Sequence, residues 1–359
     1  MTRRTLREVW VCVERAFSPQ VPAARLGAFR AIVCLVALYD LLLWSNSVLP
    51  DAAAVTAGTQ DRPWRPIFLM QVLGLGPADL ATATAIYYTG IVALLCGAVG
   101  FCARASCAVG AVAFYWWSGL GYSFGKPHHD KVALAITLAA LPFARVGGGF
   151  AVDALWRRRW RRSRGGARAV RGTPIRLAMV TLAFGYCGAG LAKLLIGGPE
   201  WFNGYTLQGI MLGHDGVLSR VVGGSPTLCQ LQSVGVVFVQ AAFPLALFWH
   251  RSRWFFLPMA TLFHLMTWMT MDTGPYMRVW LMLFAFVALE RVPGALRAWL
   301  RGGVASAVAA SVAALSFVAL VAYVLSQAVA WPLVAAFFAS LAVWFGAWFH
   351  RVGGASAAA

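Results

Sequence analysis

Lysine is rare in this chain, and one lysine lies inside an apolar segment. Lys and Arg together number 30, and only three of them are lysines: Lys126, Lys131 and Lys193. Arginine stays charged in proteins, whereas a buried lysine can lose its proton and act as a base. Lys193 lies in the sequence FGYCGAGLAKLLIGG, where burial disfavours its charged form. We therefore expect Lys193 to be a catalytic base, and we expect Lys126 and Lys131 to extend toward lipid head groups.

Two histidines are candidates for acid–base chemistry. His129 lies in the turn KPHHDK, and His264 lies in the apolar segment FHLMTW. Histidine exchanges protons near neutral pH. Neighbouring histidines rarely converge on one metal ion, and no other His or Cys residues have ligand spacing, so the sequence predicts no metal site. We expect His129, His264 and Lys193 to lie near the outer boundary of the bilayer, on different helices, and to line one cavity.

Aromatic and acidic residues next to these positions are candidates for substrate binding. Trp201 and Tyr205 follow a glycine-rich turn after the lysine-bearing segment. Trp268 lies one helical turn beyond the Phe-His dipeptide, and Asp272 lies one turn further. Trp201 and Tyr205 suit an aromatic anchor at the membrane interface equally well. The sequence leaves both interpretations open for these two residues.

Three other polar residues in apolar segments are expected to be structural. Arg30 and Asp40 are about 15 Å apart along a helix, so each needs a partner elsewhere. Gln240 precedes Pro244 by four residues and is expected to form a hydrogen bond between helices. Small residues near the lysine form a face that lets a neighbouring helix approach closely. They are Gly185, Gly188, Ala189, Gly190 and Ala192.

The composition predicts a membrane protein. Hydrophobic residues make up 60% of the chain and charged residues 12%, whereas about a quarter of a soluble domain is charged. A water-soluble enzyme and a disordered protein are both excluded. We predict an all-α fold, a polytopic integral membrane helix bundle of about ten transmembrane helices. The predicted spans are 26–49, 80–101, 105–124, 131–149, 174–196, 227–249, 254–271, 276–291, 304–327 and 329–349.

The arginines predict the orientation. They concentrate before the first span and in alternate loops, with the largest cluster between Arg157 and Arg171. By the positive-inside rule, both termini are cytoplasmic and the protein is a multi-pass protein of the cell membrane. Residues 1–25 form an amphipathic cytoplasmic segment on the inner leaflet. The arginine cluster suits anionic membrane lipid, and no folded module accompanies it that would indicate a nucleic-acid partner.

The order of several motifs resembles a known family. The resemblance covers about residues 26–291 and is to the HTTM family, the horizontally transferred transmembrane domain. That family is similar to the membrane domain of vitamin K-dependent gamma-glutamyl carboxylase. The motifs are LGAFR ending at Arg30, FCARASC from Phe101, HHD from His128, VDAL from Val152, AGLAKL around Lys193, and the segment from Phe263 to Tyr276.

The resemblance implies a membrane fold with a site that opens to the lumenal or periplasmic face. It assigns Lys193 to the position of the base that activates vitamin K hydroquinone, and it places His129 and His264 in the site region. Trp201 is eight residues from Lys193, which is further than in the carboxylase. Residues 304–349 are predicted to be an additional two-helix membrane hairpin.

Two functions remain open. The first is a quinol-dependent membrane enzyme with its site at the outer membrane face, in which Lys193 is the base. The second is a non-catalytic membrane partner or maturation factor for a secreted peptide, or a partner of a separate soluble domain. A transporter is disfavoured, because the sequence shows no inverted repeat and no matched pair of broken helices.

Overall fold

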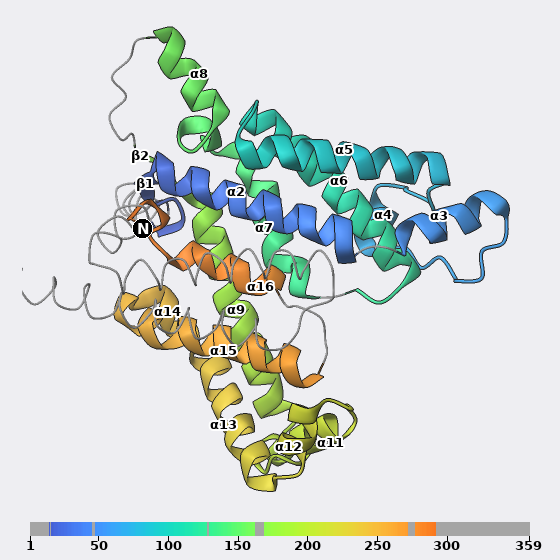
Figure 1. Ribbon diagram of the computed structural model, residues 1–359, viewed down its shortest axis with the longest axis vertical. Coiled ribbons are helices and arrows are strands. Elements are labelled where there is room, and N and C mark those ends of the chain that lie inside the picture. The colour runs from blue at the N-terminus through green and yellow to red at the C-terminus, as the bar shows by residue number, and fades with distance from the viewer. Residues whose placement is uncertain are drawn as a thin grey trace, which may run out of the picture. The chain divides into compact units, whose positions relative to one another are not determined.

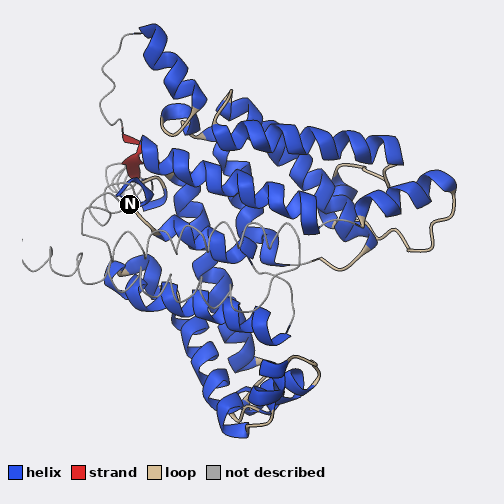
Figure 2. Cartoon of the chain, in the orientation of Figure 1, coloured by secondary structure: helices blue, strands red, loops and turns tan. Residues whose placement is uncertain are grey.

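The structure is built almost entirely from helices (Figures 1 and 2). The computed structural model describes residues 14, 16–44, 47–127, 129–161, 169–271 and 277–291. The all-α prediction holds for this part of the chain, apart from two short strands. The predicted hairpin 304–349, Asp272 and most of the predicted N-terminal segment 1–25 lie outside the described residues.

The first group of helices is arranged around α2 (Ala23–Tyr39), which continues into a π-helical turn at Asp40–Trp44. Helix α2 packs against α5, and α5 lies along α6 (Figure 1). Asp79 begins α5, because its side chain accepts a hydrogen bond from the Thr82 backbone N–H at 2.7 Å. The other helices of this group are α3 (Val48–Ala57), α4 (Phe68–Val72), α5 (Leu80–Val99), α6 (Ala103–Phe124), α7 (Val132–Ala140) and α8 (Val152–Arg161).

The second group is built on α9 (Thr173–Leu195), which packs against both α7 and α13. Figure 1 shows α9 running past α7 and α15 toward α11 and α12. The remaining helices are α10 (Pro199–Phe202), α11 (Tyr205–Leu212), α12 (Val217–Gly223), α13 (Pro226–Ala242), α14 (Leu245–Phe248), α15 (Arg253–Met271) and α16 (Met277–Met282). A 3-10 turn, Leu283–Phe286, follows α16 and packs against α9.

A small antiparallel sheet joins the start of α2 to the start of α9. Strand β1 (Gln20–Pro22) pairs with β2 (Ala169–Arg171), and Gln20 lies opposite Arg171. The hydroxyl oxygens of Ser18 and Thr173 are 2.9 Å apart beside this sheet. The sequence patterns did not predict these strands, because three residues are too few to show an alternating pattern.

Four of the predicted spans differ from the helices that form. The span predicted at 227–249 is divided into α13 and α14, and the span predicted at 276–291 is α-helical only over α16 and then forms two 3-10 turns. The span predicted at 26–49 is divided, because regular helix changes to a π-helical turn at Asp40 and α3 begins at Val48. The span predicted at 131–149 is α-helical only over α7, and short 3-10 turns follow at Leu141–Phe143 and Val146–Gly148. Pro142 lacks a backbone donor, and the glycines at 147–149 favour helix poorly, so the helix ends early.

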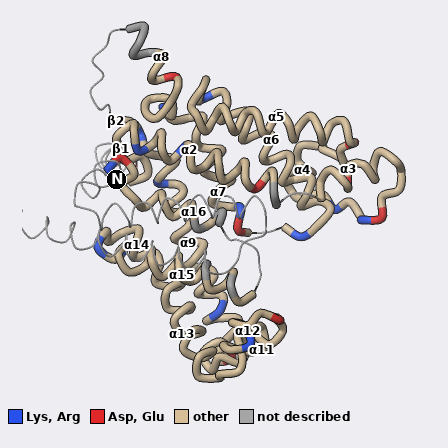
Figure 3. The backbone as a smooth tube through the Cα atoms, viewed as in Figure 1, with Lys and Arg blue, Asp and Glu red and all other residues tan. Residues whose placement is uncertain are grey.

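The membrane-spanning capacity of individual helices is established only in part. Among the described residues, Leu80–Val99 and Thr173–Leu195 are long and apolar enough to cross a membrane. A third candidate is the pair Val217–Gly223 and Pro226–Ala242, which is bent by 97°. Figure 3 shows that charged residues are sparse along the helices and lie mostly toward helix ends and loops. The count of ten spans stays a prediction.

Candidate functional site

Helix α9 carries the predicted base on the face that packs against α13. Tyr186, Gly190 and Lys193 are four and three positions apart, so they project from the same side of the helix. A Cβ atom at Gly190 would overlap the backbone nitrogen of Ala241 in α13. Glycine therefore permits the close approach of the two helices at this position. Of the small residues predicted to form a packing face, Gly190 makes this contact, whereas Gly185 and Gly188 have no neighbour within 4 Å of a Cβ position.

Lys193 forms three interactions at the end of α9. Its Nζ donates a hydrogen bond to Gln240 Oε1 at 2.9 Å and contacts the Ala189 carbonyl oxygen at 3.4 Å. The same atom lies 5.1 Å from the centroid of the Trp201 ring. Trp201 packs so tightly on Gly197 that a Cβ atom there would overlap the indole ring. The interhelical hydrogen bond predicted for Gln240 is thus present, and its partner is Lys193.

The partners of Lys193 are electrically neutral. An amide oxygen, a backbone carbonyl and an indole ring surround its amino group. Within the described part of the chain, no carboxylate forms an ion pair with Lys193. A nearby carboxylate favours the ammonium form of a lysine, whereas an amide oxygen accepts a hydrogen bond from the charged and the neutral form. These surroundings are compatible with exchange of a proton at Lys193.

Lys131 shows the opposite arrangement and corrects the prediction made for it. It does not extend to head groups: its Nζ lies 2.7 Å from Asp40 Oδ2, and both side chains are buried. The ammonium group also lies 5.2 Å from the centroid of the Tyr122 ring. Burial of the Asp40 carboxylate costs free energy unless a positive charge lies beside it. The Lys131 side chain therefore lies in the interior, where it pairs with Asp40. Lys126 is exposed, and its extension toward head groups stays a prediction.

His264 is buried against α9 and contacts a residue that the motif analysis did not single out. Its Nε2 and the Tyr186 hydroxyl form a short hydrogen bond. The Tyr186 ring stacks on Phe243, the residue that follows α13, with 4.4 Å between ring centroids. Phe243 follows Gln240 by three positions, so the C-terminal end of α13 contacts both Lys193 and Tyr186. Helices α9 and α13 therefore link the surroundings of Lys193 to those of His264.

His129 lies in a different setting. It begins the 3-10 turn His129–Lys131 and is exposed, whereas its neighbours Asp130 and Lys131 are buried. The turn packs against α7 and α16. In the described ranges, no hydrogen bond joins His129 or His264 to Lys193. The single cavity predicted for these three residues stays a prediction.

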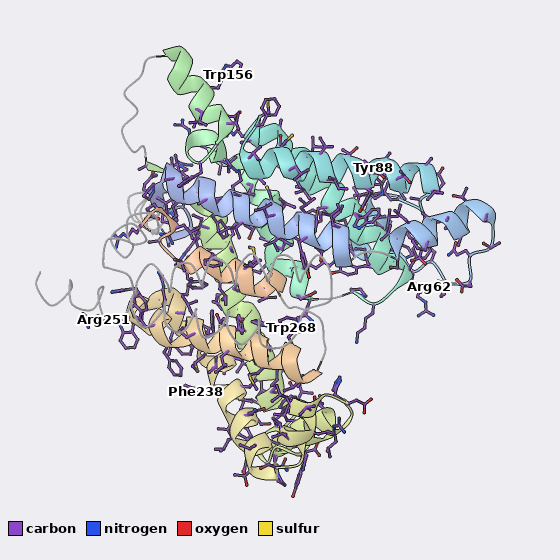
Figure 4. All side chains as sticks on the ribbon, viewed as in Figure 1. Arg62, Tyr88, Trp156, Phe238, Arg251 and Trp268 are labelled. Atoms are coloured by element: carbon purple, nitrogen blue, oxygen red, sulfur yellow. The ribbon has the colours of Figure 1, made fainter. Side chains whose placement is uncertain are left out.

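The predicted substrate-binding residues are distributed unevenly. Trp201 contacts Lys193, whereas Tyr205 at the start of α11 is 65% exposed. Trp268 is partly buried on α15, the helix of His264 (Figure 4). Asp272 lies outside the described residues. The described residues contain no group of three His, Cys, Asp or Glu side chains that could hold a metal ion.

Two other motif residues have structural roles, in a part of the bundle away from Lys193. Arg30 is completely buried and donates to the carbonyl oxygens of Val146, Ala98 and Phe150 at 2.9, 3.1 and 2.6 Å. Its predicted structural role is consistent with these bonds. The Asp153 carboxylate accepts hydrogen bonds from the backbone N–H groups of Cys102 and Ala103, both at 2.8 Å. It satisfies donors at the start of α6 that lack partners within the helix.

Tyr186 is the main residue of this region that the motif analysis missed. Its spacing from Gly190 and Lys193 was visible in the sequence and indicated a shared helix face. Without a structure, a tyrosine in an apolar segment is equally consistent with simple packing. Only the approach of His264 from α15 gives its hydroxyl group a specific partner.

Comparison with known proteins agrees with the motif order. A family model described as the HTTM domain matches residues 19–289. No curated protein and no solved structure matches the chain. The match covers the whole region from β1 to the 3-10 turn after α16, including Lys193, His129 and His264. The chain therefore belongs to the HTTM family and is a membrane protein of that type.

Proposed function

We propose that this protein is a quinol-dependent membrane enzyme in which Lys193 is the base, with its site at the outer face of the cell membrane. The observation that carries this proposal is the neutral set of partners around Lys193. The same three groups favour the ammonium ion after Lys193 has accepted a proton, because Gln240 Oε1 and the Ala189 carbonyl accept hydrogen bonds. The Trp201 ring attracts the cation through its π face.

The surroundings of Lys193 suit a ligand with an apolar tail and a polar ring. Leu195 and Ile196, just beyond the lysine, are 80% and 86% exposed, so the helix end presents apolar surface to the bilayer. A bound quinol would supply a hydroxyl proton and reducing electrons. Lys193 accepts the proton at Nζ, Trp201 forms a wall beside it, and Gln240 orients the amino group.

Contacts between loops support the predicted sidedness, with both termini cytoplasmic and the chain crossing the membrane many times. Arg25 Nη2 donates to the Ala285 carbonyl at 3.0 Å, which joins the segment before the first predicted span to the second half of the span predicted at 276–291, whose end is expected on the cytoplasmic side. On the side predicted to be external, Leu80 N–H donates to Thr56 Oγ1 at 2.8 Å and Arg65 N–H donates to the Ser123 carbonyl at 2.8 Å. The Arg25 and Arg65 contacts each join segments near span ends that the alternating topology assigns to one side, whereas the Leu80–Thr56 bond lies within the connection between the first two predicted spans.

The second candidate is a non-catalytic membrane partner or maturation factor for a secreted peptide. One observation favours it. Lys193, Gln240 and Trp201 satisfy one another without a ligand, which is also the arrangement of a structural lysine. Lys193→Arg distinguishes the two candidates, because arginine preserves the positive charge but cannot serve as a base. An enzyme that uses Lys193 as its base loses function, whereas a protein with a structural lysine does not.

The test uses the purified full-length protein and the Lys193→Arg variant. Mass spectrometry of the lipid extract is expected to find a quinone with the wild-type protein. Lys193→Arg should fold, insert and lose the cellular function, whereas Lys126→Arg, at an exposed lysine, should retain both. A Lys193→Arg protein that keeps full function would contradict the base role. Absence of quinone from active wild-type protein would contradict the quinol dependence.

A further inference from the structure

Two buried cysteines from different helices face each other inside the bundle. Cys34 of α2 and Cys107 of α6 are 73 positions apart in the sequence, and their sulfur atoms are 4.0 Å apart. Both residues are free thiols and both are 0% exposed. Helices α2, α5 and α6 pack against one another around them (Figure 1). The pair therefore arises from the packing of separate helices and not from a local motif.

Helix α5 leaves space for the two sulfur atoms. A Cβ atom at Gly97 would lie 2.9 Å from Cys34 Sγ and 3.6 Å from Cys107 Sγ, so glycine permits the contact between the thiols. Cys229 shows a different way of accommodating a buried cysteine. It is also 0% exposed, and its thiol donates to the Val222 carbonyl oxygen at 3.2 Å. Cys34 and Cys107 contact each other instead.

A positive charge lies one helical turn from Cys34. Arg30 precedes Cys34 by four residues on α2, so the two side chains project from the same side of the helix. Arg30 is completely buried, and its hydrogen-bond acceptors are neutral carbonyl oxygens. No described carboxylate forms an ion pair with it. A guanidinium group beside a cysteine favours the thiolate, which is the form that reacts with oxidants.

We propose that Cys34 and Cys107 are an oxidation site, at which a peroxide converts the two thiols into a disulfide bond between α2 and α6. The thiolate of one cysteine attacks hydrogen peroxide and breaks the O–O bond, which gives a sulfenic acid and a hydroxide that takes up the thiol proton. The second thiol then attacks the sulfenic sulfur, the S–S bond forms and water leaves. Two thiols are oxidised, and one hydrogen peroxide is reduced to two molecules of water.

Burial restricts this reaction to the pair itself. A bulky oxidant such as a glutathione disulfide does not reach a sulfur atom that is 0% exposed, whereas hydrogen peroxide is small enough to enter through fluctuations of the packing. The sulfenic acid formed at one cysteine already contacts the other thiol. A disulfide bond holds its sulfur atoms about 2 Å apart, so they need to approach by only about 2 Å. The proposal is independent of the function proposed for Lys193.

The test uses full-length protein in nanodiscs, treated with hydrogen peroxide, denatured, alkylated and digested. Mass spectrometry is expected to find a peptide pair linked through Cys34 and Cys107, which should be absent from a sample reduced before alkylation. The unfolding temperature of the oxidised wild type should exceed that of the reduced protein by about 5 °C, because the bond closes a long loop of the unfolded chain. The mass spectrum tests the proposal without any variant.

Cys229→Ala is the matched control, because Cys229 is as deeply buried as the pair. It should keep both the link and the rise in unfolding temperature on oxidation, whereas Cys34→Ala and Cys107→Ala should each lose both. The proposal is overturned if oxidised wild type contains no link between Cys34 and Cys107. It is also overturned if Cys34→Ala keeps the full rise in unfolding temperature on oxidation.

Discussion

Lys131 and Lys193 place the same functional group in two electrostatic settings. Lys131 Nζ lies 2.7 Å from the Asp40 carboxylate, and the two side chains form a buried ion pair. Lys193 faces the amide oxygen of Gln240, which imposes no charge state. The first lysine joins the turn of His129 to the end of α2, and the second is the residue proposed to exchange a proton. This difference in partners gives two clear predictions at the scale of single residues.

The first prediction concerns the buried ion pair. Asp40→Asn leaves the Lys131 charge buried without its counter-ion and should lower the free energy of unfolding by about 3–5 kcal/mol. The double variant Asp40→Leu with Lys131→Met should recover most of this loss, because it removes both charges. Arg62→Gln breaks the exposed pair with Asp51 and should cost about 1 kcal/mol or less. Denaturant unfolding in mixed micelles measures all three, and equal losses for Asp40→Asn and Arg62→Gln would contradict the prediction.

The second prediction concerns the partner of Lys193. Gln240→Glu keeps the size of the side chain but supplies a carboxylate that holds the lysine in its ammonium form. The variant should therefore fold and lose function, with its unfolding temperature unchanged or raised. Gln240→Leu removes the acceptor without adding charge and should cost about 1–3 kcal/mol of stability. Cellular function and unfolding temperature are measured together, and a functional Gln240→Glu protein would indicate that Lys193 is structural.

At the scale of elements, the packing of α9 on α13 positions the site. The closest approach lies at Gly190, with the Lys193–Gln240 bond on one side and the Tyr186–Phe243 stack on the other. Any change in the separation of these helices therefore alters both the lysine and the tyrosine that binds His264. Helix α10, which carries Trp201, completes the surroundings of the lysine.

Glycine substitutions along α9 test this dependence on helix separation. Gly190→Ala places a methyl group against the backbone of α13 and should cost about 1–3 kcal/mol of stability as the helices separate. Gly185→Ala meets no described atom within 4 Å and should stabilise α9 by up to about 1 kcal/mol through helix propensity. Thermal unfolding of the two variants distinguishes them. The unfolding temperature should fall for Gly190→Ala and rise for Gly185→Ala. A change in the same direction for both variants would show that the contact between α9 and α13 does not determine the effect.

The sequence predicted individual features of these elements better than their mutual contacts. The helices near 80–101, 105–124, 174–196 and 254–271 formed almost as predicted, because long apolar runs determine them locally. The partners of Asp40 and Gln240 were expected but not identifiable, because pairing across helices depends on packing that no local pattern encodes. The prediction for Lys131 was wrong for this reason. Its own segment suggested a position at the membrane interface, whereas its side chain pairs with Asp40, which lies 91 residues earlier in the chain.

At the scale of the whole molecule, the arginine distribution predicts an alternating topology with both ends in the cytoplasm. Reporter fusions to the full chain are expected to place His214 outside and Ser163 inside. A fusion at Ala359 should also report the inside, because ten spans return the chain to its starting side. The fusion at Ala359 tests the number of spans, and the fusions at His214 and Ser163 test the orientation of the chain in the membrane. An external reading at Ala359 would be incompatible with ten spans.

The pairing of β1 with β2 also orders events during biosynthesis. Gln20 cannot meet Arg171 until the intervening chain has left the ribosome, which takes roughly 8–30 s at typical rates of synthesis. During this interval the segment before α2 has no strand partner, and α2 and α9 are not yet joined at their starts. Closure of the sheet therefore follows synthesis of α5, α6 and α7. The N-terminal region thus completes its fold only after half of the protein has been made.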